Sequence, residues 1–183
     1  MTIVLILLVL VVLLVLAPVL LYNNLVKLRN RIEGAWAQID VQLKRRYDLI
    51  PNLVETVKGY ATHEKETLDA VVRARNAAGA ASGPADQAQA ENMLTASLRQ
   101  VFALSEAYPD LKANQGFLQL QEELAGTEGR ISYARQFYND TVLRYNTKIQ
   151  TFPAVVIANA MRFREREYFE ADDTSRGPVQ VEF

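Results

Sequence analysis

One apolar run, Ile3 to Leu21, constrains this chain more than any other feature. Eighteen of its 19 residues are apolar, none is charged, and the exception is Pro18. As a helix the run is about 29 Å long, close to the ~30 Å hydrocarbon core of a bilayer. Only Met1 and Thr2 precede it, without a basic n-region, and Ala17-Pro18-Val19 is a poor cleavage site. An uncleaved signal-anchor is therefore favoured over a cleaved signal peptide, and we expect Ile3 to Leu21 to cross the lipid bilayer.

Basic residues flank the run on one side only. Lys27, Arg29 and Arg31 follow it closely, whereas no basic side chain precedes it. Positive flanks stay in the cytoplasm. We therefore expect a single-pass protein of the cytoplasmic membrane, with the N-terminus outside and the C-terminal domain in the cytoplasm.

The remainder has the composition of a soluble domain. The other 164 residues carry all 41 charged groups, and the net charge is −1. The chain has no Cys, which excludes disulfides, thiolate metal sites and thiol nucleophiles. The balanced charge argues against a nucleic-acid partner, because dedicated nucleic-acid binders are usually strongly basic.

Apolar residues follow at helical spacing, and no strand pattern or internal repeat is present. The first stripe runs from Leu25 to Ile50, where Pro51 predicts a break, and the second runs from Leu53 to Val72. Gly79 to Asp86 is a loop by composition. Two further helices are expected at about 87–107 and 114–151, the second with an apolar stripe from Phe117 to Ile149, followed by a short helix at 154–169.

The fold class expected is all-α: an N-terminal transmembrane helix, then an elongated antiparallel four-helix bundle with a short C-terminal fifth helix. The predicted domains are the anchor at 1–21, the bundle at 22–169, and a disordered acidic tail at 170–183. Length matching favours a hairpin of the first two helices at Pro51, and one long helix kinked there is the alternative. Gly126 and Gly129, inside the last long helix, predict close helix approach or, alternatively, a local kink.

Several stretches together resemble the LemA family of bacterial membrane proteins. They are Tyr22–Val26, Ala35–Val54 with AWAQIDVQLKRRYDLIPNLV, Glu106–Ala113 with EAYPDLKA, Arg135–Asp140 with RQFYND, and Phe163–Phe169 with FREREYF. The resemblance implies a single-pass membrane protein with a small external N-terminus and a cytoplasmic helical bundle. It implies no catalytic residue.

Patterns for catalysis or cofactor binding are missing. A di-metal carboxylate bundle needs two Glu-x-x-His motifs, whereas this chain has only His63, with Tyr60 three residues before it. No serine lies in a Gly-x-Ser-x-Gly elbow, and Gly126–Gly129 is not a phosphate loop. We therefore expect no catalytic residue, no metal and no cofactor.

The candidate polar groove consists of Glu128, Arg135 and Tyr138. Glu128 and Arg135 lie two turns apart, near Tyr138 on the last long helix. They are expected to pair with Arg73, Arg75 or the basic run Lys44–Arg46. A structural role in setting helix register is the favoured interpretation, and a binding groove is the alternative. The run Lys44–Arg46 itself is interpreted as a solvated turn near Pro51, and a surface for an acidic partner is the alternative.

The segment from Phe152 to Phe169 carries a candidate membrane interface. Its apolar first half is followed by Arg162, Arg164 and Arg166, which would lie near anionic headgroups if the preceding helix ends at the bilayer. The simpler alternative is a short fifth helix packed across the bundle end.

The favoured function is a membrane-anchored, non-enzymatic module that presents an interaction surface to an unknown protein partner. A self-assembling membrane scaffold, a homo-oligomer, is the second hypothesis. A small-ligand sensor that uses the bundle interior is the third.

Overall fold

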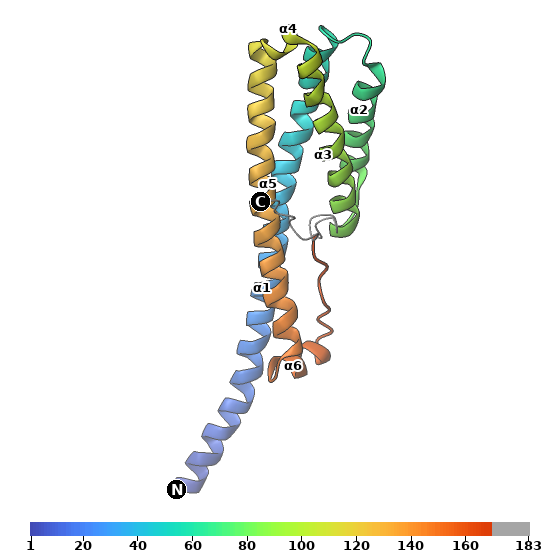
Figure 1. Ribbon diagram of the computed structural model, residues 1–183. Helices are drawn as coiled ribbons and strands as arrows, with labels where there is room; N and C mark the ends of the chain where they lie inside the picture. Colours follow the sequence, from blue (N-terminus) through green and yellow to red (C-terminus); the bar gives the residue numbers. More distant parts are fainter. Residues whose placement is uncertain (170–183) are drawn as a thin grey trace, which may run out of the picture. The chain divides into compact units, whose positions relative to one another are not determined.

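The computed structural model describes residues 1–169, where all the regular secondary structure is helical and no strand is present, which confirms the all-α class (Figure 1). Residues 170–183, the predicted acidic tail, lie outside the described residues. The helices are α1 (Thr2–Lys58), α2 (Lys65–Ala80), α3 (Pro84–Ala107), α4 (Pro109–Lys112), α5 (Gln115–Gln150) and α6 (Ala154–Ala160).

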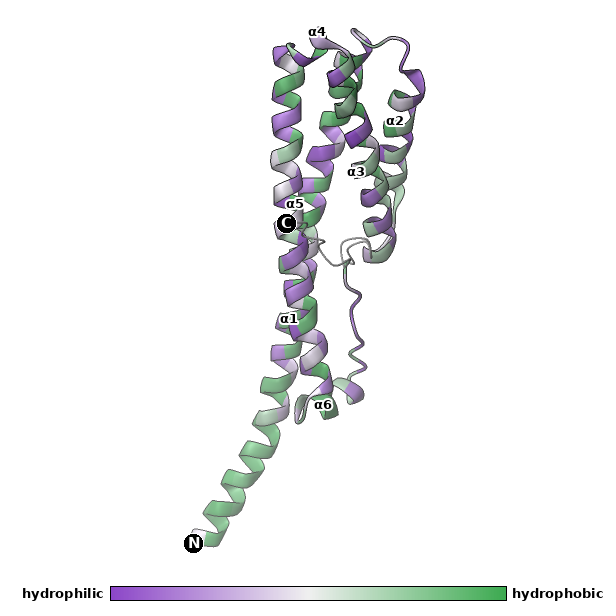
Figure 2. Ribbon diagram, in the orientation of Figure 1, coloured by the Kyte–Doolittle hydropathy of each residue, from purple (hydrophilic) through white to green (hydrophobic). Residues whose placement is uncertain are grey.

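The apolar run forms the first part of α1, and its side chains project away from the protein. Figure 2 shows this part of the helix as uniformly hydrophobic, and the apolar window long enough to cross a membrane has no buried residue. Leu14, for example, is 76% exposed. Such a surface is costly in water, since each Å² of apolar area left wet costs roughly 25 cal/mol. The N-terminal part of α1 therefore indicates membrane anchoring.

The break predicted at Pro51 is wrong, because α1 continues through Pro51 to Lys58. Proline in a helix leaves the carbonyl four residues earlier without its N–H partner. That carbonyl belongs to Tyr47, and the Arg75 Nε of α2 donates a hydrogen bond to it at 3.3 Å. The chain turns later, between Gly59 and Glu64, before α2 begins.

The chain divides into two compact units, which both draw on α1 and α5. Unit 1 comprises residues 1–37 and 136–167, and unit 2 begins with residues 38–135 and includes Tyr168 and Phe169. The core of unit 2 takes residues from α1 to α5: Ile50, Leu53, Val57, Ala61, Leu68, Val71, Ala74, Ala78, Leu94, Leu98, Val101, Leu111, Phe117 and Leu124. Helices α2 and α3 pack side by side within this unit (Figure 1).

Local sequence sets the ends of the unit 2 helices. Gly83 has φ 88°, a conformation that glycine adopts without strain, and Pro84 then occupies the first turn of α3. The Asn114 Oδ1 accepts a hydrogen bond from the Phe117 N–H at 2.9 Å and caps α5. The predicted close approach at Gly126 and Gly129 is wrong, since an added Cβ at either position would meet nothing within 4 Å.

In unit 1, α1 and α5 contribute one buried stripe each. The α5 stripe is the predicted one and includes Tyr138, Val142, Tyr145 and Ile149. Opposite, α1 buries Leu25, Ile32 and Ala35, and Trp36 meets Tyr138 edge-on with ring centroids 5.5 Å apart.

The predicted helix at 154–169 ends early, at Ala160. The Phe163 N–H donates to the Ala158 carbonyl at 2.9 Å, and the Arg162 N–H donates to the Asn159 carbonyl at 3.3 Å. These two bonds, with Arg162 at φ 56°, form a Schellman cap. The chain beyond it, Phe163–Glu167, is irregular and is called the return segment below.

The role of Arg75 is testable by a double-mutant cycle. Arg75→Met should lower the free energy of unfolding by about 1 kcal/mol, because the partly buried Tyr47 carbonyl loses its donor. In a Pro51→Ala background the restored N–H at position 51 should serve that carbonyl, and the same substitution should then cost less. Chemical denaturation of the full chain in nonionic detergent, followed by helical circular dichroism, measures both values. Arg73→Met, on the same helix but exposed, is the control, and equal losses in the two backgrounds would contradict this assignment.

Candidate functional site

A buried ionic cluster in unit 2 is centred on Arg46, which is 3% exposed. The Arg46 Nη1 donates to the Glu91 Oε2 at 3.1 Å and lies 2.9 Å from the Glu128 Oε2. Its Nη2 donates to the Thr95 Oγ1 at 2.7 Å. One guanidinium from α1 thus joins two residues of α3 to one of α5.

Tyr47 and Gln87 complete the hydrogen bonding around Glu91, which is 2% exposed. The Tyr47 hydroxyl donates to the Glu91 Oε1, and the Gln87 Nε2 donates to the same oxygen at 3.1 Å. The Gln87 Nε2 also lies within hydrogen-bond distance of the Ala78 carbonyl, at 3.1 Å. Both carboxylate oxygens of Glu91 therefore have donors, as a buried charge requires.

Burial dominates the electrostatics of the cluster. It raises the pKa of Glu91 above its ordinary value, against the opposing effects of the Tyr47 hydrogen bond and the Arg46 charge. Burial, the hydrogen bond to Glu91 and the Glu91 charge also raise the pKa of Tyr47, so this phenol stays protonated and donates. The cluster thus links α1, α3 and α5 through polar contacts of buried groups.

A groove of about 260 Å³ adjoins this cluster in unit 2. Its apolar lining comes from Leu98 and Phe102 on α3 and from Leu124 and Ala125 on α5. Arg46, Thr95, Arg99, Gln121 and Glu128 supply its polar lining. Such a combination suits a side chain or helix of another protein, with an apolar body and a polar anchor.

The three residues of the predicted polar groove each have a different partner. Glu128 pairs with Arg46, one of the partners that the sequence suggested. The Arg135 guanidinium lies 4.5 Å from the Phe169 ring centroid, and burial lowers the pKa of Arg135. Tyr138 belongs to unit 1, where its hydroxyl donates to the Glu167 carbonyl at 2.9 Å. A ligand site formed by all three stays a prediction.

The interpretation of Lys44–Arg46 as a solvated turn is wrong for Arg46, which lies in mid-helix and is buried. Lys44 and Arg45 are exposed and form ion pairs with Asp48 at 3.1 Å and with Glu123 at 3.7 Å. The sequence did carry a signal for this difference. Arg46 follows Leu43 by three residues and precedes Ile50 by four, so it lies on the apolar stripe of its helix.

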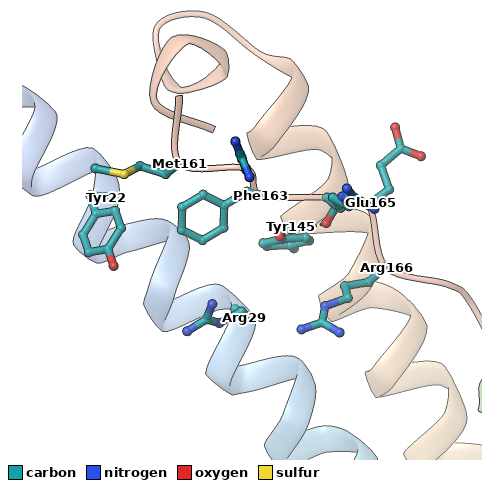
Figure 3. A pocket seen from close by; sticks show the side chains of 9 residues that line it. Tyr22, Arg29, Tyr145, Met161, Phe163, Glu165 and Arg166 are labelled. Atoms are coloured by element: carbon teal, nitrogen blue, oxygen red, sulfur yellow. Dashed lines mark hydrogen bonds between the residues drawn. The ribbon is translucent and has the colours of Figure 1, made fainter. Parts of the chain in front are cut away.

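A second pocket, of about 440 Å³, lies in unit 1 beside the return segment (Figure 3). The three arginines of the predicted membrane interface, Arg162, Arg164 and Arg166, all line it. Arg29 of α1 joins them, and Tyr22 and Tyr145 line the same pocket. Contact of these arginines with a membrane stays a prediction at this point.

Three residues of α5 hold the return segment, and the sequence analysis missed this role. The Tyr145 hydroxyl donates to the Arg164 carbonyl at 2.9 Å. The Asn146 side chain accepts from the Arg166 N–H and donates to the Arg166 carbonyl, both at 2.9 Å. Tyr138 joins them, since its hydroxyl donates to the Glu167 carbonyl. Tyr138, Tyr145 and Asn146 therefore stand at positions i, i+7 and i+8 of one helix face, a spacing visible in the sequence.

Removing the Arg46 charge alone should lower the free energy of unfolding more than removing the charges of Arg46 and Glu91 together. Arg46→Met should lower the free energy of unfolding by about 3–5 kcal/mol, because Glu91 is then left buried without a counter-charge. Glu91→Gln should cost less, and Arg46→Met with Glu91→Gln should recover much of the first loss. Denaturation of the full chain in detergent gives these values. A double variant no more stable than Arg46→Met alone would contradict the pairing.

The raised pKa of Glu91 predicts the direction of a pH effect. As pH rises from the ordinary carboxyl range, the unfolded chain releases this proton before the folded one does. Stability should therefore fall until the folded pKa is passed. Glu91→Gln should flatten this fall in midpoint denaturation measurements, whereas Glu122→Gln, at an exposed position of α5, should leave it unchanged. An unchanged slope in Glu91→Gln would refute the prediction.

The sequence of this chain is similar to those of several known proteins. The model of the LemA family matches residues 35–183. Protein LemA of Metamycoplasma hominis is 27% identical over 163 residues, which cover 87% of this chain and 73% of that protein. Magnetosome protein MamQ of Magnetospirillum gryphiswaldense and magnetosome protein MamQ 1 of Paramagnetospirillum magneticum are each 22% identical over 184 residues, 86% of this chain and 68% of theirs. Because the family match covers most of the sequence, the chain belongs to the LemA family.

Proposed function

We propose that this protein is a membrane-anchored, non-enzymatic helical module that presents a cytoplasmic interaction surface to a protein partner. The observation that carries the proposal is the continuity of α1, which begins as the exposed apolar run and ends in the core of unit 2. One helix thus contributes residues both to the anchor and to the core of unit 2.

Orientation and domain organisation form part of the proposal. Lys27, Arg29 and Arg31 follow the span and favour an external N-terminus with the rest of the chain in the cytoplasm. We take residues 1–21 as the anchor and 22–169 as an antiparallel four-helix bundle domain. The core of unit 2 supports this assignment, since α1, α2, α3 and α5 each contribute to it.

The α3–α5 groove is the surface that we assign to the partner. It combines apolar walls with the polar groups of Arg46 and Glu128 at its lining. Both groups are already held by the ionic cluster, so little side-chain entropy is lost when a partner binds there. Among residues 1–169, no group of His, Asp and Glu side chains is arranged to hold a metal ion.

A single-cysteine experiment tests this proposal in native membranes, because the 183-residue sequence contains no Cys. Ala125→Cys places a thiol in the groove, and Ala77→Cys places a matched thiol on the exposed surface of α2. Both should react with a membrane-impermeant maleimide only after the cells are permeabilised. With a membrane-permeant maleimide–benzophenone reagent, irradiation should give a discrete adduct from position 125 and none from position 77.

The other outcomes are equally informative. Labelling of both cysteines in intact cells would overturn the cytoplasmic orientation. The same adducts from both positions, or none from either, would overturn the groove as the interaction surface. An adduct of twice the 20.6 kDa chain mass would replace the separate partner with a second copy and favour the scaffold.

A further inference from the structure

The unit 1 pocket carries an excess of positive charge. Its lining contains four arginines, Arg29, Arg162, Arg164 and Arg166, and one acidic residue, Glu165. The Glu165 Oε1 already accepts a hydrogen bond from the Gln150 Nε2 at 2.6 Å. The pocket therefore offers cationic donors with little internal compensation, which suits an anion.

Most of these guanidinium groups have no acidic partner among residues 1–169. Arg166 lies 3.6 Å from the Glu33 carboxylate. Within residues 1–169, no carboxylate lies within ion-pair distance of Arg29, Arg162 or Arg164. The Arg29 guanidinium instead lies 5.9 Å from the Phe163 ring centroid, a cation–π contact that orients it and leaves its N–H groups available.

The backbone at Arg162 points to a role for its side chain. This residue has φ 56° in the Schellman cap of α6, a position where glycine is the usual residue. A side chain there costs conformational energy, of the kind that proteins retain at functional sites. Glycine would form the same cap without this strain. We therefore attribute the arginine at this position to a role of its guanidinium group.

The pocket lies next to the membrane-spanning run along the chain. Tyr22, which lines the pocket, directly follows Leu21, and aromatic residues of this kind favour the bilayer interface. Arg29 is eight residues past Leu21, about 12 Å along the helix axis, and side chains of a helix lean toward its N-terminus, here toward the bilayer.

Apolar side chains on and beside α6 add a second membrane-seeking feature. Phe152 is 83% exposed, Val156 58% and Met161 59%, and Met161 also lines the pocket. Figure 3 shows Met161 and Tyr22 at one end of the labelled group, with Phe163 between Tyr22 and Tyr145. Exposed apolar groups beside arginine side chains are typical of segments that lie at an anionic lipid surface.

We propose that this pocket binds the phosphate of an anionic glycerophospholipid headgroup, with Arg29, Arg162 and Arg164 as donors and the apolar side chains near the acyl chains. The site rests on the proposed membrane anchoring. Of the two alternatives that the sequence left open for residues 152–169, the proposal takes the membrane interface, with the arginines of the return segment and of the α6 cap at lipid headgroups.

Lipid binding by the full chain tests the site. The detergent-solubilised protein is titrated with dioleoyl phosphatidylglycerol, dioleoyl phosphatidylcholine or inorganic phosphate, and bound species are counted by native mass spectrometry. Phosphatidylglycerol should bind at least ten-fold more tightly than phosphatidylcholine. Inorganic phosphate in excess should displace it only weakly, because phosphate lacks the acyl chains.

Matched variants separate the pocket from net charge. Arg162→Gly with Arg164→Gln should weaken phosphatidylglycerol binding about ten-fold or more, since each arginine near an anionic surface contributes roughly five-fold. Its melting temperature should not fall, because glycine relieves the strain at position 162. Arg73→Gln with Arg130→Gln removes the same charge from exposed positions outside the pocket and should leave binding unchanged.

Three outcomes would overturn the site: equal affinity for the two lipids, equal loss in both double variants, or inorganic phosphate that binds as tightly as the lipid. Carbonate extraction of membranes from the same cells keeps this result separate from the anchor. A pocket variant that stays in the membrane but has not lost phosphatidylglycerol binding disproves the site alone. Wild-type protein that is extracted disproves the anchoring on which it rests.

Discussion

Everything in this protein depends on backbone hydrogen bonding along α1. In lipid, each peptide group must find its partner within the helix, so an apolar run of 19 residues in a bilayer is forced to be helical. The same ladder extends through all 57 residues of α1 and passes Pro51, where it lacks one donor. Arg75 supplies that donor from α2, and the helix therefore persists up to Lys58.

Desolvation of charge organises unit 2 in a similar way. A guanidinium as buried as that of Arg46 is tolerated only with its charge balanced and its donors satisfied. Glu91, Glu128 and Thr95 meet these conditions from two other helices. Register between α1, α3 and α5 is thereby specified by polar contacts, while the apolar residues supply most of the burial. The groove beside this cluster inherits side chains that are already fixed.

In unit 1, polar side chains of α5 form hydrogen bonds with the main chain of an irregular segment instead of with charged side chains. Tyr138, Tyr145 and Asn146 use their polar groups on the main chain of the return segment, so that this irregular backbone is satisfied without secondary structure. Fixing the carbonyls of Arg164 and Arg166 leaves the arginine side chains to line the pocket. Arg162 contributes from a strained cap, which is difficult to explain by folding alone.

Much of this architecture could be read from hydrophobic periodicity. The stripe predicted for α5 is buried from Phe117 to Ile149 except for the half-buried Leu120, and the starts and ends of α3 and α5 were predicted to within about three residues. The apolar run and the absence of strands in residues 1–169 also followed from the residues themselves. The reason is that burial in a helix repeats every 3.6 residues, which is a local property.

Only the tertiary structure decided where the chain departs from what its local sequence pattern predicts. Pro51 stays helical because a residue 24 positions away completes its hydrogen bonding. Arg46 is buried because acidic groups from α3 and α5 reach it, and α6 ends early because a Schellman cap redirects the chain. The sequence by itself determined helix, stripe and anchor, since these depend on neighbouring residues. Partners for buried polar groups depend on residues distant in the chain, and these the folded structure alone brings together.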